Sequence, residues 1–479
     1  MISGLASLFR PSYPGVIVYM LQSDEYRVGP YLKWYWRTND FSRVAKRRTL
    51  VRTRSAKLLH LALIIGMLAQ IILAGVLITL GATHRMTAGV PFGLAILVSY
   101  PVVWAHLVVL PLLLGRLLIA SPKERRVVKQ SKEIFAKNKA IKIAVAGSYG
   151  KTTMKELLLT VLKEGKKVVA TPANKNVAVS HGVFAKKLTG DEDIIIIEYG
   201  EGAPGDVERF SATTKPNIGI ITGLAPAHLD RYKTLQAAGK DIFSLADYLH
   251  SKNVYVNSES PDAKPFIKSG YIQYDSSGVA GWKVEDIQIT PEKTVFKMKK
   301  GKQILNITSG LIGRHQVGPL ALTAALADKF GLSTTQIETA MTKTKPFEHR
   351  MEPRALGGAW IIDDTYNGNL EGIRAGLALL SEINSGKKTY VTPGLVDQGQ
   401  ESERVHKTVG KLIAQAKPDK VVLMKNSVMD WIKTGLREGK YSGDLVIEDK
   451  PLDFYNNLDQ YVAAGDVVLM QNDWTDNYS

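Results

Sequence analysis

The feature that most constrains this chain is an uncharged apolar run of 23 residues at positions 58–80. As an α-helix this run would be about 34 Å long, enough to cross a hydrocarbon core of about 30 Å. A second apolar stretch, residues 90–120, holds a single charge, Arg116, near its end. Kinks are expected in it at Pro91, Pro101 and Pro111. The sequence therefore predicts a two-helix transmembrane hairpin.

Basic residues gather on both sides of this hairpin. Residues 1–140 hold 20 Lys and Arg against 5 Asp and Glu, whereas the rest of the chain holds 42 against 40. The flanking cations are Arg43, Lys46, Arg47, Arg48, Arg52, Arg54 and Lys57 before it, and Lys123, Arg125, Arg126, Lys129 and Lys132 after it. Because loops rich in Lys and Arg stay in the cytoplasm, we expect a cell-membrane protein with two spans and its folded domains on the cytoplasmic side. Two buried helices of a soluble protein are the alternative interpretation.

Charge and composition exclude several classes of function. A nucleic-acid-binding protein would carry its positive charge on the folded domains, so no nucleic-acid partner is expected. The chain has no cysteine, which rules out disulfide frameworks, thiolate zinc sites, iron–sulfur clusters and a cysteine nucleophile.

A phosphate-binding loop is predicted where the pattern changes from membrane helix to alternating strands and helices. Residues 141–146 predict a buried strand and residues 154–163 predict a helix. Between them lie Gly147, Ser148, Tyr149, Gly150, Lys151, Thr152 and Thr153. In such a loop, backbone N–H groups and the helix N-terminus hold phosphate oxygens, the lysine neutralises the outer phosphates, and a threonine hydroxyl can bind Mg²⁺. Val145 stands where the standard motif has its first glycine.

Three further runs, residues 194–198, 218–222 and 254–257, are short, β-branched and almost continuously apolar, as in a parallel sheet covered on both faces. Ligands gather at the carboxyl ends of such strands. Glu198, His228 and, further along, Lys240 follow these strands. Taken singly, each is equally explained as a surface or capping residue.

Taken together, several motifs resemble the Mur ligases, the ATP-dependent amide ligases of peptidoglycan precursor synthesis. The resemblance covers roughly residues 140–479, and the segment 363–369 is most similar to the members that add D-alanyl-D-alanine. The motifs are 147–153, 171–176, 198–200, 227–232, 239–243, 313–315, 349–350 and 363–369.

The resemblance implies ATP and Mg²⁺ as cofactors and an acyl phosphate as the intermediate. It places Lys151 on the β- and γ-phosphates, Thr152 and Glu198 on one Mg²⁺, and His228 on a second. Lys240 matches a lysine that several members carry as a carbamate, which would turn a cation into a metal-binding anion. An unmodified lysine that contacts phosphate is the alternative.

The remaining predicted site residues also follow from the resemblance. Asn174 and Asn176 lie on a loop that contacts substrate and metal-bound phosphate, although turn-forming asparagines would explain them as well. Arg350 is expected on a phosphate and Asp364 on the ribose hydroxyls. The adjacent Tyr366 and Asn367 are expected to position the nucleotide or the incoming amine.

The predicted fold class is α/β: a Mur ligase central parallel-sheet domain of the phosphate-loop type and a C-terminal Rossmann-like domain, preceded by the hairpin. Strands at 388–392, 421–424 and 466–470 support the last domain, and a hinge is expected near residues 343–347. The predicted parts are a basic cytoplasmic or interfacial segment 1–56, the hairpin 57–120, a basic linker 121–139, the central domain 140–344 and the C-terminal domain 345–479.

The sequence departs from the family pattern in three places. Gln316 and Pro319 replace two expected asparagines near the adenine, and the end of the chain lacks the expected glycines. The hairpin stands where Mur ligases have a domain for the UDP-sugar. We therefore expect a small-molecule or lipid-linked cell-wall precursor presented at the membrane. The sequence leaves open the carboxylate and amine substrates and the oligomeric state.

Three other functions compete with this interpretation. A poly-γ-glutamate or folylpolyglutamate-type ligase shares the phosphate loop, but the segment 364–367 favours the D-alanyl-D-alanine-adding type. Lipid II amidating ligases carry a four-cysteine zinc ribbon, which this chain cannot form. A membrane-tethered nucleotide-binding module without catalysis is the third alternative, and it would not need to keep every charged residue of the site.

Overall fold

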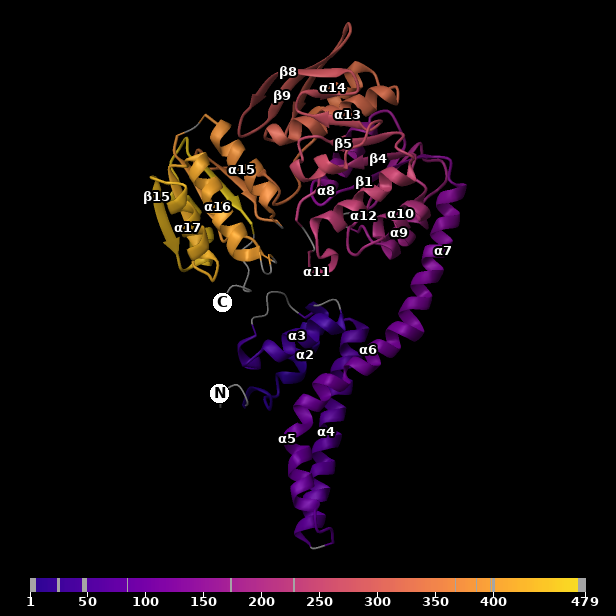
Figure 1. The fold of residues 1–479 in the computed structure, drawn as a ribbon, viewed down its shortest axis with the longest axis vertical. Helices are drawn as coiled ribbons and strands as arrows, with labels where there is room; N and C mark the ends of the chain where they lie inside the picture. Colours follow the sequence, from indigo (N-terminus) through magenta and orange to yellow (C-terminus); the bar gives the residue numbers. More distant parts are fainter. Residues whose placement is uncertain are drawn as a thin grey trace. The chain divides into compact units, whose positions relative to one another are not determined.

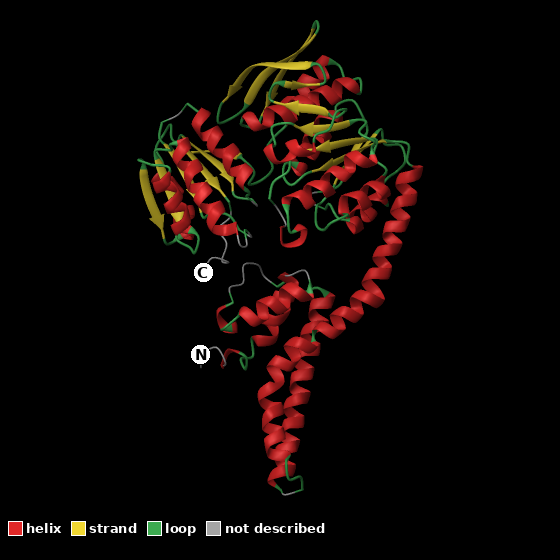
Figure 2. Ribbon diagram, viewed as in Figure 1, coloured by secondary structure: helices red, strands yellow, loops and turns green. Residues whose placement is uncertain are grey.

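The computed structural model describes residues 6–23, 26–44, 50–83, 85–172, 175–226, 229–366, 368–384, 386–396, 398 and 401–472. It divides the chain into two compact units, residues 1–126 and 127–479 (Figure 1). The first unit is helical, and the second contains two β-sheets with their covering helices (Figure 2).

Two long antiparallel helices dominate the first unit. Its elements are α2 (Tyr13–Ser23), α3 (Val28–Arg37), η1 (Phe41–Arg43), α4 (Arg54–Ala82), α5 (Gly89–Leu107), α6 (Val109–Gly115), the π-helical turn η2 (Arg116–Ala120) and the start of α7 (Ser121–Lys137). The helical stretches Arg54–Ala82 and Gly89–Lys137 are long and apolar enough to cross a membrane. Most of their apolar surface is exposed, including Leu61, Leu68 and Ile72.

Small residues let α4 and α5 approach closely. A Cβ atom added at Gly89 would lie 2.5 Å from the Leu77 carbonyl oxygen, and one at Gly66 would lie 2.3 Å from the Trp104 ring. The predicted kinks are only partly confirmed. Pro101 lies inside the continuous helix α5, and the helix breaks after Leu107, four residues before Pro111, because a proline cannot bond that carbonyl.

The central sheet of the second unit has ten strands in the order β10-β9-β8-β7-β6-β5-β4-β1-β3-β2. Strands β1 to β6 run parallel to one another, and β7 to β10 extend the sheet by antiparallel pairing from β6 onward. Their bounds are β1 (Ile141–Ala146), β2 (Val168–Ala170), β3 (Ile194–Glu198), β4 (Ile218–Ile221), β5 (Val254–Asn257), β6 (Ile272–Asp275), β7 (Gly278–Val279), β8 (Trp282–Ile289), β9 (Thr294–Lys300) and β10 (Gln303–Ser309).

Helices cover both faces of the parallel half of this sheet, which explains why its strands are apolar throughout. They are α8 (Lys151–Leu162), α9 (Ala178–Ala185), α10 (Asp206–Thr214), α11 (Leu229–Tyr232), α12 (Leu235–Tyr248), η3 (Pro261–Phe266), η4 (Arg314–Gln316), α13 (Val317–Lys329) and α14 (Thr334–Thr342). Ile143 and Ile196 pack on the face of α8 and α13, whereas Ala144 and Ile197 pack on the face of α10 and α12. In Figure 1, β1, β4 and β5 lie between these two helix layers.

The second sheet has six strands in the order β11-β12-β16-β13-β14-β15, of which only β11 is antiparallel. Its elements are β11 (Glu352–Leu356), β12 (Ala359–Asp364), α15 (Leu370–Glu382), β13 (Lys388–Thr392), α16 (Ser402–Ala416), β14 (Lys420–Met424), α17 (Met429–Glu438), β15 (Asp444–Glu448), α18 (Pro451–Asn456), η6 (Leu458–Tyr461) and β16 (Val467–Gln471). Its two faces are packed by separate apolar clusters. The predicted α/β class is confirmed, and the division at residues 344 and 345 stays a prediction.

Candidate active site

The phosphate loop connects β1 to the N-terminus of α8. Gly147 has φ +144°, and a Cβ atom there would lie 2.3 Å from the Thr222 hydroxyl oxygen. Gly150 caps α8 with φ +73°. These left-handed conformations favour glycine, and they turn the chain so that α8 starts at Lys151 with its first N–H groups free for an anion.

The end of β4 holds this loop in place. Ser148 donates its backbone N–H to the Gly223 carbonyl at 2.9 Å, and the Thr222 hydroxyl donates to the Tyr149 carbonyl. A Cβ atom at Gly223 would lie 2.3 Å from the Tyr149 ring, so the ring lies directly on the backbone. The loop conformation is therefore fixed by contacts with the neighbouring strand.

The Lys151 ammonium is paired with an acid. Its Nζ lies 2.7 Å from Glu201 Oε2 and also donates to the Gly147 carbonyl. The Lys151 side chain is 12% exposed and that of Glu201 is 5% exposed. The lysine predicted to bind phosphate is thus at the loop, held by a carboxylate that the sequence analysis did not single out.

Glu198 lies at the centre of a second cluster, at the carboxyl end of β3. Its Oε1 accepts hydrogen bonds from the Thr152 hydroxyl at 3.1 Å and from Asn176 Nδ2 at 3.2 Å. Its Oε2 is buried, makes no hydrogen bond to the residues that the structure describes, and lies 3.3 Å from the ammonium of the fully buried Lys155. His181 Nε2 bonds the Glu198 carbonyl at 2.9 Å.

This cluster suits Mg²⁺ in its chemistry. A threonine hydroxyl and a carboxylate are hard oxygen donors, and Mg²⁺ is usually held by one or two protein oxygens, waters and substrate phosphates. The buried Glu198 Oε2 has a lone pair that no hydrogen bond uses. Thr152 and Glu198 are therefore the residues that would hold the ion.

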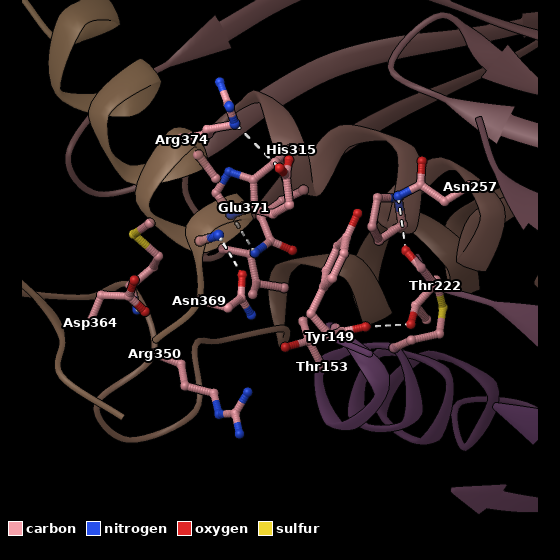
Figure 3. A pocket seen from close by; sticks show the side chains of 18 of the residues that line it. Tyr149, Thr153, Thr222, Asn257, His315, Arg350, Asp364, Asn369, Glu371 and Arg374 are labelled. Atoms are coloured by element: carbon pink, nitrogen blue, oxygen red, sulfur yellow. Dashed lines mark hydrogen bonds and ion pairs between the residues drawn. The ribbon is translucent and has the colours of Figure 1, made fainter. Parts of the chain in front are cut away.

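A cavity of about 440 Å³ opens beside the loop. Figure 3 shows Tyr149, Thr222 and Asn257 on one side of it, with Arg350 and Asp364 on the other. Because the first set comes from the central sheet and the second from the six-stranded sheet, the cavity lies between these two parts of the second unit.

Asp364 is anchored at the cavity wall. Its carboxylate accepts hydrogen bonds from Gln471 Nε2 at 2.7 Å and from the Met351 backbone N–H at 3.2 Å. Burial raises the pKa of Asp364 from 3.8 to about 6, because the low-dielectric surroundings disfavour the charged form. The Arg350 guanidinium lies 4.6 Å from the centre of the Tyr366 ring, a cation–π contact that orients both side chains at the cavity.

Comparison with known proteins shows which proteins this chain is similar to. Residues 145–327 match the family model of the Mur ligase middle domain. The chain is 25% identical to the UDP-N-acetylmuramoyl-tripeptide--D-alanyl-D-alanine ligase of Mycobacterium leprae over 69% of this chain and 70% of that protein. It is 26% identical to the Escherichia coli protein of the same name over 58% of this chain and 63% of that one. The chain thus spans 63–70% of these two curated relatives.

The solved structures agree on the fold. The MurF ligase of Thermotoga maritima, solved in complex with ADP, aligns with a TM-score of 0.63 and 21% identity, over 73% of this chain and 80% of that one. The chain therefore contains a Mur ligase middle domain and has the Mur ligase fold. Its ten-stranded sheet carries the phosphate loop, and the predicted Mur ligase fold is confirmed.

The structure does not test every predicted site residue. His228, Asn174 and Asn367 lie outside the described residues. Lys240 is exposed on α12, and among the described residues it has no hydrogen bond or ion pair to Thr152 or Glu198. Its role as a carbamate ligand therefore stays a prediction.

The departures near the adenine fall in the cavity. Gln316 and Pro319 both line it, beside His315, whose Nε2 lies 2.9 Å from Gln316 Nε2. Desolvation lowers the pKa of His315 to about 4, so this imidazole is neutral near pH 7. At the two positions where the family pattern has asparagines, the cavity thus has one amide side chain, Gln316, and one apolar side chain, Pro319.

Sequence reasoning missed Lys155, Glu201 and Gln471. Lys155 follows Lys151 by one helical turn, and Glu201 follows Glu198 by three residues, so both were within reach of a pattern based on spacing. Gln471 lies 107 residues from Asp364 and no local signal connects them. It begins the segment that departs from the family's glycine-rich end.

Proposed function

We propose that this protein is a MgATP-dependent, membrane-attached ligase that joins a carboxylate of a cell-wall precursor to an amine, D-alanyl-D-alanine or a close relative. The γ-phosphoryl group of ATP would pass to a carboxylate oxygen, releasing ADP. The amine nitrogen would then attack the acyl carbon, phosphate would leave, and the nitrogen would lose a proton.

The observation that carries this proposal is the hydrogen bond between Thr152 and Glu198, 3.1 Å long, on the phosphate loop that borders the cavity. It brings the carboxylate at the end of β3 to the hydroxyl in the first turn of α8. A nucleotide in the cavity would place its phosphates against these groups. A loop that only stabilises the fold would not require a buried carboxylate there.

Each residue has a role that follows from its charge and position. Lys151 would neutralise the outer phosphates, and Thr152 with Glu198 would hold Mg²⁺, which reduces the repulsion between the carboxylate and the phosphate. Arg350 would contact a phosphate and Asp364 the ribose. The proposed roles of His228 and Lys240, on a second ion, complete the set of charged groups.

The membrane attachment is proposed from the first unit. Its two apolar helical stretches are long enough to span a bilayer, leave Leu61 and Ile65 exposed, and carry basic residues at both ends. Anchoring would raise the effective concentration of a lipid-linked precursor at the same surface. The alternative acceptor is a soluble UDP-linked precursor.

The decisive experiment uses the full-length protein in lipid nanodiscs. It is incubated with ATP, D-alanyl-D-alanine and either UDP-linked or lipid-linked tripeptide precursors, and products are read by mass spectrometry. We expect a product heavier by the dipeptide less one water, together with ADP. Lys151→Ala should form at least about 10²-fold less of this product.

Two results would contradict the proposal. Product from the UDP-linked precursor alone would show that the acceptor is not presented on a lipid. If no precursor or amine panel stimulates ATP consumption, the protein is a nucleotide-binding module without ligase activity.

A further inference from the structure

Glu201 is the acid that holds the phosphate-loop lysine. Its Oε2 lies 2.7 Å from Lys151 Nζ, and both side chains are almost completely buried. An ammonium has three donors, and Glu201 and the Gly147 carbonyl take two of them. When Lys151 turns more than its third donor toward phosphate oxygens, its contact with Glu201 opens, and the Glu201 carboxylate then needs another counter-charge.

The Glu201 carboxylate cannot move with the Lys151 ammonium, because hydrogen bonds hold the turn that carries Glu201 in place. The Gly200 backbone N–H donates to the Asn176 carbonyl at 2.9 Å. Asp206 Oδ2 accepts from the N–H groups of Gly202 at 3.2 Å and Ala203 at 2.7 Å. These bonds fix Glu201 at the loop, so opening the pair leaves a buried carboxylate next to anionic phosphates.

The nearby cations that the structure describes are already engaged. The Lys155 ammonium lies 3.3 Å from both Glu198 and Glu156, and the Arg231 guanidinium donates to the Gly202 carbonyl at 2.7 Å. A nucleotide adds only negative charge. A buried carboxylate without a counter-charge is destabilising, and a divalent cation is the partner that a carboxylate and phosphates share.

We propose that Glu201 couples divalent-cation binding to nucleotide binding. It pairs with Lys151 in the empty site and becomes a cation-facing carboxylate when Lys151 turns to the phosphates. This inference rests on the proposed nucleotide site and adds to it a residue that makes metal-free nucleotide a poor ligand.

The test is calorimetric titration of the full-length protein in nanodiscs with the non-hydrolysable β,γ-imido analogue of ATP, with MgCl₂ or with EDTA. In Glu201→Gln the metal-free affinity should rise about tenfold, because the competitor for Lys151 has lost its charge. In the same variant, the factor by which Mg²⁺ raises the affinity for the analogue should fall to a similar extent, because metal binding and nucleotide binding are thermodynamically linked.

Two further variants test whether the effect depends on the position and the charge of Glu201. Glu208→Gln removes the same charge from an exposed position on α10 and should behave as the wild type. Glu201→Asp keeps the charge on a side chain shorter by one methylene and should keep the wild-type gain from Mg²⁺. Thermal melting of each variant confirms that it is folded.

The outcomes separate this inference from the proposed function. The coupling is overturned if Glu201→Gln binds the metal-free analogue no more tightly than Glu208→Gln does. It is also overturned if Mg²⁺ no longer raises the affinity of Glu201→Asp for the analogue. Either result leaves the nucleotide site itself intact. If the wild type does not bind the analogue even with Mg²⁺, the nucleotide site itself is wrong and both proposals fail.

Discussion

Asp364 should limit the stability of the protein above pH 6. Burial raises the pKa of its carboxyl from 3.8 to about 6, so the folded state binds a proton more tightly than the unfolded chain does. A carboxyl group with a raised pKa does not lower the free energy of unfolding below about pH 4, because there it is protonated in both the folded and the unfolded state. Its cost grows as the pH rises from about 4 to about 6 and is complete above that.

The change in the free energy of unfolding that is expected for Asp364→Asn can be worked out from the structure. A shift of about two pKa units corresponds to about 3 kcal/mol at pH 7. The amide nitrogen of an asparagine would face Gln471 Nε2, so the 2.7 Å hydrogen bond is lost, at a cost of about 1 kcal/mol. Gln471 is not free to reverse its amide, because its Oε1 accepts from the Tyr390 hydroxyl at 3.1 Å. The net gain should be about 1–2 kcal/mol.

The assay is thermal unfolding of the wild type and Asp364→Asn in nanodiscs from pH 4.5 to 8. The variant should become more stable relative to the wild type as the pH rises, by roughly 2–6 °C in Tm at pH 8. The same variant should lose ligase activity, because the proposed contact of Asp364 with the ribose needs an ionised acceptor. A difference in Tm that does not change with pH, or that favours the wild type more at pH 8 than at pH 5, would refute this reasoning.

Three more predictions follow from single contacts. Lys151→Ala should lower ATP-dependent product formation by about 10²-fold or more in a coupled ADP-release assay, with an unchanged circular dichroism spectrum. Glu198→Gln should raise the Mg²⁺ concentration required for half-maximal activity, because the carboxylate 3.1 Å from Thr152 loses its charge; an unchanged Mg²⁺ titration would exclude Glu198 as a ligand. Gly410→Ala should destabilise the protein by about 1–3 kcal/mol in thermal denaturation, since its Cβ would lie 2.2 Å from the Ile432 carbonyl oxygen, whereas Gly372→Ala meets only a side-chain atom at 3.7 Å and should cost less.

The sequence by itself determined the elements whose signals are local. The strands 141–146, 194–198 and 254–257 have the predicted bounds, because a strand buried on both faces must be apolar along its length. The phosphate loop was also readable, since its glycines need conformations that other residues avoid. The apolar helices of the first unit were predicted from length and charge alone.

Only the tertiary structure decided which charged groups meet. Glu198 reaches Thr152 across 46 residues, and Gln471 reaches Asp364 across 107. The fold also places the Lys155 ammonium 3.3 Å from Glu198, whereas Lys240 lies at an exposed position of α12 and its metal-binding role stays a prediction. The apolar pattern of a strand reflects the burial of each of its residues, which is a local property. Ion pairs depend on the order of strands in the sheet, which a pattern of neighbours along the chain does not contain.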